Sequence, residues 1–488
     1  MKTKIWSRLN SVIKYLSAFL LILLCFNNSS GKYNYSYANN YDSIPIMAAT
    51  NMLKKHMEEF DIPGMQIAVS IKGKLIWSGA FGFRDVENKI AVNSQTSFRI
   101  ASVSKSLTAA AIGILLQDKK IDLDSSVYKY LPSFPKKRWN FTLRQLAGHT
   151  SGIRHYNSIE DASSTIHYNS VTESLSQFKD DTLLFEPGSQ YSYSSYGYVL
   201  LSAVIESASA QNFPDFINSK VFVPSEMTHT SMDYCDKDIP NRSKFYILNE
   251  NNKRILAPFI DNSNKFASGG MISTAEDLVK FGNAVLFDKF LKPEIKDILL
   301  SKMKTKDGKE TGNGIGWEIG KDPGDRPVYY MDGSLPSARS FIIVYPDEQM
   351  IISVLLNTGS SVFFNKEEVF MLADLFLDPS GLDPTTKEKN NISGKYTYST
   401  LFDGESITGE INISENNGKL NGTMTIPNSF FATRIIPVPV VKIRGDEIEL
   451  LAIPGNWFSL TIKKNINTVS GKWSFGPIKG DLTGKYEK

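Results

Sequence analysis

Ser102 and Lys105 stand three residues apart at the start of an apolar run, residues 107–116, that predicts a helix. Residues three apart lie on one face of a helix, so the lysine amine is expected beside the serine hydroxyl. A serine hydroxyl is a weak nucleophile until a base takes its proton, and a lysine with a lowered pKa can be that base. Because Ser-x-x-Lys is a short motif, other segments must support the prediction of a nucleophilic serine.

Two further segments carry groups suited to the same chemistry. Tyr193 lies in a Tyr- and Ser-rich stretch before a second predicted helix, residues 198–207, where its phenol can reach a site or pack by its ring. Gly333 lies in a Tyr-Tyr-Met-Asp-Gly-Ser stretch ahead of a predicted hairpin. A glycine at a strand edge lets a ligand approach the backbone closely, and a plain turn before the strand is the alternative.

Residues 148–156 hold His149 and His155 on either side of Ser151. The segment lacks the Gly-x-Ser-x-Gly pattern in which a nucleophilic serine stands on a sharp turn between a strand and a helix. We interpret it as a structural turn rather than as a second catalytic pair.

The elements that must position these groups are helices and hairpins in alternation. Helices are predicted at 46–60, 275–287 and 366–377, the second capped by Ser273 or Thr274. The strongest hairpin signal covers residues 340–356, where two β-rich runs flank Pro-Asp-Glu-Gln, and an earlier hairpin is predicted around Lys-Gly-Lys at 72–74.

The composition changes after residue 377. Residues 378–391 are rich in Pro, Thr and charge and predict a linker, beyond which the helical pattern stops. Residues 392–488 hold short alternating runs separated by turn residues such as Asn417-Gly418 and Gly445-Asp446. Short strands at this spacing predict a small antiparallel barrel or sandwich.

The N-terminus has the pattern of a secretory signal. Residues 1–31 combine four basic residues, an apolar stretch and small residues that favour cleavage near Gly31, with Ala38 as a second option. Residues 32–45 are polar and predict a flexible leader. We therefore expect a secreted or periplasmic protein, with membrane anchoring through an uncleaved N-terminal segment as the alternative.

Charge and cysteine content narrow the function classes. A lipid anchor on Cys25 is disfavoured because Leu24 stands where such signals carry a small residue. Residues 1–31 hold four of the 54 basic and none of the 51 acidic residues, so removing them leaves 50 against 51 and no reason to expect nucleic-acid binding. Only Cys235 then remains, which excludes an intrachain disulfide and predicts an inert, small side chain.

The order of the motifs resembles one family. Ser-x-x-Lys at Ser102, then Tyr193-Ser-Ser195, then a glycine-containing strand before a hairpin are similar to the serine β-lactamase-related hydrolases. That group includes class C β-lactamases, D-Ala-D-Ala carboxypeptidases, D-aminopeptidases and esterases. The likeness extends over most of residues 46–377, and no Ser-Asp-Asn or Lys-Thr-Gly occurs, which disfavours a class A β-lactamase.

Single segments refine this resemblance. Residues 151–156 and 193–198 are most similar to the mitochondrial β-lactamase-like serine proteins and their bacterial relatives. Residues 392–488 resemble the lipocalin-like module of some bacterial members. The resemblance implies an α+β fold of the β-lactamase/transpeptidase type, an antiparallel sheet flanked by helices with a helical insert, followed by a small C-terminal all-β barrel-like domain.

The resemblance also implies catalytic roles. Ser102 is the nucleophile, Lys105 the base or proton relay, and Tyr193 the group that passes a proton to the leaving group and later activates water. The backbone N–H groups of Ser102 and Ser334 form the oxyanion hole. Neither a metal nor an organic cofactor is implied.

The predicted substrate-binding residues depart from the family pattern. Ser195 stands where relatives often carry Asn, and Met331 stands two residues before Gly333, where relatives usually carry Lys or His. Methionine supplies neither a cation nor a proton, which argues against strong β-lactamase or carboxypeptidase activity. Asp332 suits an amine-bearing substrate, whereas Arg339 replaces the missing cation if it points inward.

The sequence thus predicts a serine hydrolase that acts on an ester or amide, including peptides with D-amino acids, through an acyl-enzyme on Ser102. Its expected partners are small-molecule or peptide substrates, and its oligomeric state stays open. The alternative is a catalytically weakened penicillin-binding-like protein with a ligand-binding or structural role, marked by Met331. The C-terminal domain either covers the mouth of the site or binds a ligand of its own.

Overall fold

The computed structural model describes most of the chain after the N-terminal 34 residues: 35–37, 44–251, 253–359, 364–383, 388, 391–402, 405–416, 419–426, 434–438, 440–444, 447–452, 458–465, 468–475 and 478–487. The predicted signal, residues 1–31, lies outside the described residues, as do part of the predicted linker and the two turns named in the C-terminal region. Within the described ranges, no helix is long and apolar enough to cross a membrane.

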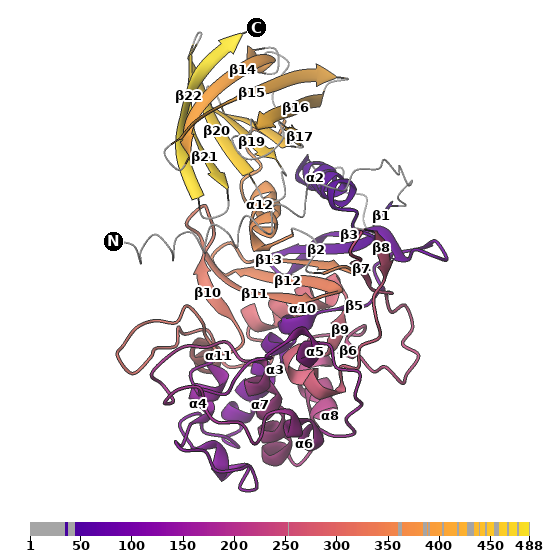
Figure 1. Cartoon of the computed structure of the whole chain (residues 1–488), viewed down its shortest axis with the longest axis vertical. Helices are drawn as coiled ribbons and strands as arrows, with labels where there is room; N and C mark the ends of the chain where they lie inside the picture. Colours follow the sequence, from indigo (N-terminus) through magenta and orange to yellow (C-terminus); the bar gives the residue numbers. More distant parts are fainter. Residues whose placement is uncertain are drawn as a thin grey trace.

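An antiparallel sheet forms the centre of the larger domain (Figure 1). Its order is β1-β3-β2-β13-β12-β11-β10, with β4 paired to β3. The described strands are β1 Tyr35–Tyr37, β2 Gly64–Ile71, β3 Lys74–Asp85, β4 Ile90–Ala91, β10 Glu318–Lys321, β11 Pro327–Leu335, β12 Ala338–Tyr345 and β13 Met350–Leu356. Both predicted hairpins are present as β2–β3 and β12–β13, and β13 pairs with β2 to join the two halves of the chain.

Helices cover both faces of this sheet, which explains the nearly continuous apolar sequence of β13, interrupted only by Ser353. Ile352 and Val354 face a cluster with α2 (Ile44–Phe60) and α12 (Lys366–Leu377), which pack against each other. Ile351 and Leu355 belong to the cluster on the opposite face, where α10 (Ala275–Leu286) packs. A strand buried on both faces loses the usual alternation of apolar and polar residues.

A helical insert lies below the sheet in Figure 1 and supplies the second wall of the site. Its central helix α3 (Ser104–Gln117) is buried along most of its length against α7 (Ser195–Ser209) and α9 (Phe266–Gly269). The remaining elements are α4 Leu143–Ala147, α5 Ile159–Ala162, α6 Val171–Ser174, α8 Phe213–Ile217, α11 Pro293–Leu299, β5 Phe98–Arg99, β6 Ser231–Met232, β7 Tyr246–Leu248, β8 Arg254–Leu256 and β9 Met271–Ser273. The expected α+β architecture is confirmed.

The C-terminal domain is a single antiparallel sheet that nearly closes on itself. Its nine described strands are β14 Gly394–Phe402, β15 Glu405–Asn416, β16 Lys419–Ile426, β17 Arg434–Val438, β18 Val440–Arg444, β19 Glu447–Ala452, β20 Phe458–Asn465, β21 Thr468–Phe475 and β22 Ile478–Glu487. The sheet runs from β17 to β18, and these end strands come together through contacts of β16 with β18 and of β17 with β19. The barrel-like domain is confirmed, while its likeness to lipocalins stays a prediction.

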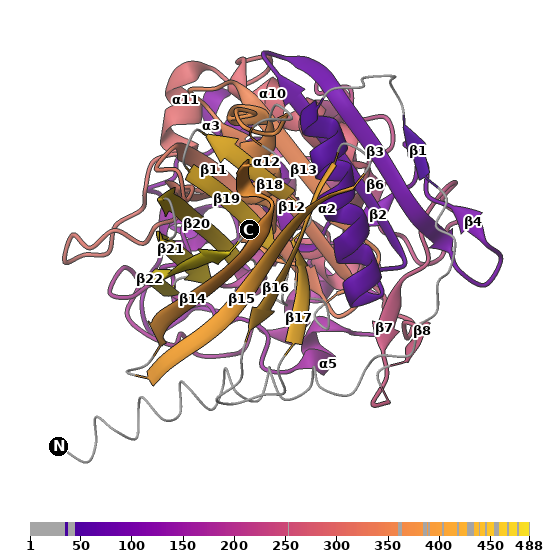
Figure 2. The ribbon, with the colours of Figure 1, turned by 90° about the horizontal axis from the view of Figure 1, so that it is seen from above.

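Strand β18 of the C-terminal domain lies over α12 (Figure 2), and the domain docks there through charged groups of this strand. Lys442 Nζ contacts Asp374 Oδ2 at 2.5 Å and donates to the Asp378 carbonyl at 3.1 Å. Arg444 contacts Asp378 Oδ2 at 2.6 Å. Because α12 covers the face of the sheet opposite α10, the domain lies away from α3 (Figure 1). The described residues that line the cavity at Ser102 all come from the larger domain, so the suggestion that the C-terminal domain covers the mouth of the site is wrong.

Several boundaries differ from the sequence prediction, among them the start of α7, at Ser195 rather than residue 198. Residues 35–37 fall in the predicted leader but form β1, which pairs with β3 through Tyr35 opposite Phe81. The first helix begins at Ile44, two residues before its predicted start, and the N-cap of α10 is Thr274, whose hydroxyl accepts from Asp277 N. Helix α12 matches its predicted range.

Candidate active site

Ser102 lies where the helical insert meets the sheet, in a 3₁₀ turn, Ala101–Val103, that leads directly into α3. Ala101 has a positive φ of 42°, a conformation that costs energy for a residue with a Cβ. The turn is held from outside by the Ser340 hydroxyl of β12, which donates to the Ile100 carbonyl at 2.6 Å. Such a strained, over-determined turn fixes the direction of the Ser102 hydroxyl before any substrate binds.

Lys105 lies in the first turn of α3 and is fully buried. Its Nζ is 3.2 Å from Ser102 Oγ, 3.1 Å from Ser195 Oγ and 2.6 Å from the Ser268 carbonyl oxygen. Burial lowers the pKa of this amine to about 7, against a smaller opposing effect from the charge of Asp332. A large share of Lys105 is therefore neutral near pH 7 and can accept a proton from Ser102.

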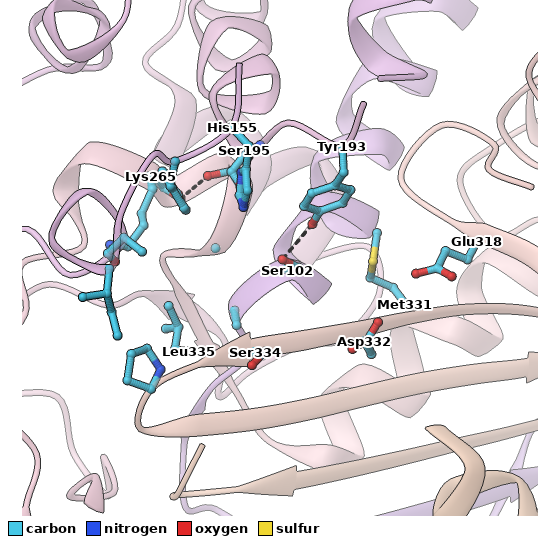
Figure 3. A pocket seen from close by; sticks show the side chains of 17 residues that line it. Ser102, His155, Tyr193, Ser195, Lys265, Glu318, Met331, Asp332, Ser334 and Leu335 are labelled. Atoms are coloured by element: carbon cyan, nitrogen blue, oxygen red, sulfur yellow. Dashed lines mark hydrogen bonds between the residues drawn. The ribbon is translucent and has the colours of Figure 1, made fainter. Parts of the chain in front are cut away.

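Tyr193 approaches Ser102 from the other side. Its hydroxyl donates to Ser102 Oγ at 2.8 Å, as Figure 3 shows. The residue comes just before Ser194, whose hydroxyl caps α7 by accepting from Gly197 N at 2.9 Å, so the start of α7 fixes the position of the phenol. Burial raises the pKa of Tyr193, which keeps the phenol protonated and able to donate.

Two histidines hold the Tyr193 segment in place. His149 Nδ1 accepts from Ser194 N at 3.1 Å, and His155 Nδ1 accepts from Ser195 N at 3.2 Å. Both rings contact the Tyr193 ring, with centroids 4.6 Å and 5.4 Å away. Burial lowers their pKa values to about 3 and about 4, so both stay neutral.

The interpretation of residues 148–156 as a structural turn fits one contact: Ser151 Oγ accepts from Ile153 N within the turn. The support that His149 and His155 give to Tyr193 was missed. The sequence offers no signal for it, because the imidazoles meet backbone N–H groups about 40 residues away.

Gly333 brings strand β11 against the nucleophile. A Cβ at this position would overlap Ser340 Oγ and the Ile100 carbonyl oxygen and would lie 3.0 Å from the Ser102 nitrogen. The strand can approach the turn of Ser102 only because this residue has no side chain. Ser334 follows directly and lines the cavity beside Ser102.

A cavity of about 470 Å³ opens over these groups. Of the residues predicted for the site, Ser102, Tyr193, Ser195, Asp332 and Ser334 line it, and Lys105 lies buried beneath it. The Met331 side chain lines it as well and lies between Tyr193 and Glu318 (Figure 3). The position at which the family pattern predicts Lys or His is thus occupied by an apolar side chain that is 3% exposed.

Asp332 and Arg339 lie at different places relative to the cavity. The Asp332 carboxylate is partly exposed at the cavity rim, 4.0 Å from the Arg339 guanidinium. Arg339 itself donates to the Phe364 carbonyl oxygen at 2.9 Å and to Asn365 Oδ1 at 3.1 Å, at the start of α12. Its Nε and Nη2 groups thus donate outside the cavity, only Nη1 faces Asp332, and Arg339 itself does not line the cavity.

Two charged residues of the lining were missed. Lys265 is 1% exposed and donates to the Ala162 carbonyl at 2.6 Å, and burial lowers its pKa to about 7. Glu318 lies at the end of the cavity with Asp332, and burial raises its pKa. Figure 3 shows Lys265 and Glu318 on opposite sides of Ser102. Neither belongs to a recognisable motif, so only the fold reveals them.

Comparisons with known proteins agree with this geometry. The family model described as Beta-lactamase matches residues 49–374. The human mitochondrial serine beta-lactamase-like protein LACTB is 33% identical over 310 residues, which cover 50% of this chain and 56% of that protein. Penicillin-binding protein 4* of Bacillus subtilis is 28% identical over 301 residues, covering 58% of this chain and 66% of that protein. The chain thus spans about half to two thirds of the length of these relatives.

Solved structures share the fold. The octameric penicillin-binding protein homologue from Pyrococcus abyssi has a TM-score of 0.62 at 21% identity, covering 90% of this chain and 99% of that one. The D-amino acid amidase from Ochrobactrum anthropi has a TM-score of 0.60 at 23% identity, covering 69% of this chain and 99% of that one. At these identities the likeness establishes the fold and not the reaction.

Proposed function

Because this chain belongs to the beta-lactamase family of serine hydrolases, we propose that it cleaves an ester or amide bond through an acyl-enzyme formed on Ser102. One observation carries the proposal: Ser102 Oγ lies 3.2 Å from a buried lysine amine and 2.8 Å from a tyrosine hydroxyl. A nucleophile flanked by a base and by a proton donor meets the geometric requirement for acyl transfer.

In the acylation step, the neutral Lys105 amine takes the proton of Ser102 while Oγ attacks the substrate carbonyl carbon. The Ser268 carbonyl accepts a hydrogen bond from the same amine, which orients the Nζ lone pair. The carbonyl oxygen gains negative charge and accepts hydrogen bonds from the backbone N–H groups of Ser102 and Ser334. One donor of this kind is worth about 3–4 kcal/mol in the transition state.

The tetrahedral intermediate then breaks its bond to the leaving group, which takes a proton from Tyr193 and departs as an alcohol or amine. The resulting phenolate takes the proton held on Lys105, whose Nζ lies 4.9 Å from the centre of the Tyr193 ring, and the phenol is restored. Water enters the vacated position, loses a proton to the same pair and attacks the ester of Ser102. Hydrolysis releases the acid and regenerates the serine.

The charge of the cavity supports a narrower substrate class. Asp332 and Glu318 lie at one end and Lys265 at the other, and Met331 stands where the family pattern predicts Lys or His. We extend the proposal to amides or esters that carry a free amino group, including D-amino-acid derivatives, as in the amidase named above. Export through residues 1–31 is also part of the proposal, and N-terminal sequencing of protein recovered outside the cytoplasm tests it.

A short-chain p-nitrophenyl ester tests the reaction class. The Ser102→Ala variant is expected to lose hydrolysis and the acyl adduct detected by mass spectrometry, while Ser104→Ala keeps both. Ser104 is a matched control, because its buried hydroxyl has no hydrogen-bond partner among the described residues. Turnover retained by Ser102→Ala contradicts the proposal, and ligand binding without an adduct in the wild type favours the binding role that Met331 suggests.

Amino-acid p-nitroanilides of D and L configuration, each with a free and an acetylated amine, test the substrate class. Faster turnover of the free amines is expected, and Asp332→Asn should reduce that preference. Equal rates for free and acetylated pairs would leave the reaction class intact and remove the narrower proposal.

A further inference from the structure

A second cluster of metal-ligating side chains lies outside the catalytic residues. It combines Cys235, which follows β6, with His167 between α5 and α6 and with Asp261 ahead of α9. The sequence predicted an inert cysteine. The fold instead brings this thiol to an imidazole and a carboxylate from two other loops.

The three ligand atoms all lie within 4.8 Å of one another. Asp261 Oδ2 is at their centre, 2.8 Å from His167 Nδ1 and 3.0 Å from Cys235 Sγ. Cys235 Sγ lies 3.9 Å from His167 Nδ1. A tetrahedral zinc ion with bonds of about 2.0–2.3 Å holds neighbouring ligand atoms about 3.4–3.6 Å apart. Shifts of about 0.5 Å therefore convert the cluster into three corners of such a site.

The donor set selects the kind of metal. Thiolate and imidazole are ligands that zinc prefers, whereas magnesium and calcium take oxygen ligands almost exclusively. Asp261 is 2% exposed, and its second oxygen accepts from Ser263 N at 2.8 Å, which orients the carboxylate from behind. The His167 side chain is 48% exposed, which leaves a path for an ion to enter.

We propose that Cys235, His167 and Asp261 bind one Zn²⁺ ion, with a fourth position open to water. On binding, the Cys235 thiol releases its proton to solvent, so the thiolate and the carboxylate together balance the charge of the ion. His167 binds through the Nδ1 lone pair, and no redox change occurs.

The ion would join three loops, one of which forms part of the cavity wall. Residues 159–168 carry α5, whose Ile159 and Ala162 line the cavity, and the Ala162 carbonyl accepts from Lys265. Asp261 N donates to the Ser164 carbonyl at 2.8 Å, so the loops already touch beside the ligands. A metal bond across them stabilises this wall without contacting Ser102.

Cobalt(II) is the spectroscopic probe, because a cysteine ligand gives it a thiolate-to-metal charge-transfer band. We expect the untagged full chain, first freed of metal by a chelator, to bind one equivalent of Co²⁺ with this band. Added Zn²⁺ should displace Co²⁺ and raise the Tm. Cys235→Ser should lose the band, and His167→Gln should weaken Zn²⁺ binding by at least about 100-fold, since even outer-shell partners are worth 10–100-fold.

The chain supplies a matched control for the histidine change. His229→Gln should bind Co²⁺ and Zn²⁺ like the wild type, since His229 does not belong to the cluster. His167→Gln also guards against misfolding of the cysteine variant, because the His167 side chain is half exposed. The proposal is overturned if the wild-type protein shows no charge-transfer band. It is also overturned if Cys235→Ser keeps the wild-type band or if His167→Gln keeps the wild-type affinity for zinc. Ester hydrolysis by the metal-free protein is measured separately, because it tests the function proposed for Ser102 and not the zinc site.

Discussion

Each of the two domains buries a lysine, and the two lysines have different surroundings. Lys105 of the larger domain contacts two hydroxyls and one carbonyl oxygen, and no carboxylate is within ion-pair distance among the described residues. Lys442 of the β domain is equally buried but contacts the Asp374 carboxylate at 2.5 Å. An amine buried without an anion loses its proton readily and becomes a base. An amine buried against a carboxylate joins two surfaces.

The difference shows where this fold can bury polar groups that lower its stability. Burying a polar group without full compensation destabilises a protein, so such groups persist where the surroundings hold them firmly. Around Lys105 that support comes from both layers of the larger domain, through Ser195 of α7 and the turn of Ser102 held by Ser340 of β12. Lys442, by contrast, is a buried lysine that holds the two domains together, and Arg326 is a second partner of the same Asp374.

Replacing each lysine by methionine gives the sharpest test of this comparison. Lys105→Met is expected to lower kcat/KM for a p-nitrophenyl ester by about 10³-fold or more, which lies within the range for loss of a general base. Its Tm should stay the same or rise, because methionine fills a similar apolar volume with no amine to desolvate. Steady-state kinetics and thermal unfolding measure both. Activity near the wild-type level would remove Lys105 from the mechanism.

Gly333 and Gly320 test whether close approach of β11 matters to the site. Gly333→Ala is expected to reduce kcat/KM by about 10²-fold or more, the scale of losing one oxyanion donor, because the new Cβ pushes the strand away from Ser102. Gly320→Ala on β10 is the matched control, since its Cβ would meet only the Tyr330 ring at 3.7 Å. Equal effects of the two changes would contradict the geometric argument.

Lys442→Met makes the same change in the β domain as Lys105→Met in the larger domain, and it should leave catalysis unchanged. We expect kcat/KM to be unchanged and apparent stability to fall by about 1.5–3 kcal/mol, the value of a hydrogen bond to a charged group. The loss is limited because Asp374 keeps its contact with Arg326 at 2.8 Å. Urea unfolding of the full chain, followed by a probe in each domain, measures it. A loss of activity without a loss of stability would reverse the assignment of the two lysines.

The smallest expected effect is a shift in pH dependence. Lys105 acts when deprotonated, so activity should rise with pH through a pKa of about 7. The charge of Asp332 raises that pKa, so Asp332→Asn should move the rising limb to lower pH. A pH profile of kcat/KM with an uncharged ester shows the shift, and movement to higher pH would contradict it.

Much of the fold was predictable because its signals are local. The helix of residues 366–377, the hairpin of β12 and β13, and the change of pattern after residue 377 all follow from periodicity and turn residues. The position of the β domain was not predictable from the sequence. Its docking depends on contacts of Lys442 and Arg444 with acidic groups of α12 and of the turn that follows it. A strand alone gives no sign of which helix it will contact.

The sequence by itself determined the family, the class of fold and the order of Ser102, Lys105, Tyr193 and Gly333 along the chain, since spacing within a turn or a helix start is local information. Only the tertiary structure decided what each of these groups touches. The two histidines against Tyr193, the opposed charges of Lys265 and Glu318, and the cluster of Cys235 join residues from distant parts of the chain. Such contacts form when the whole core packs, because burial of apolar faces brings these loops together.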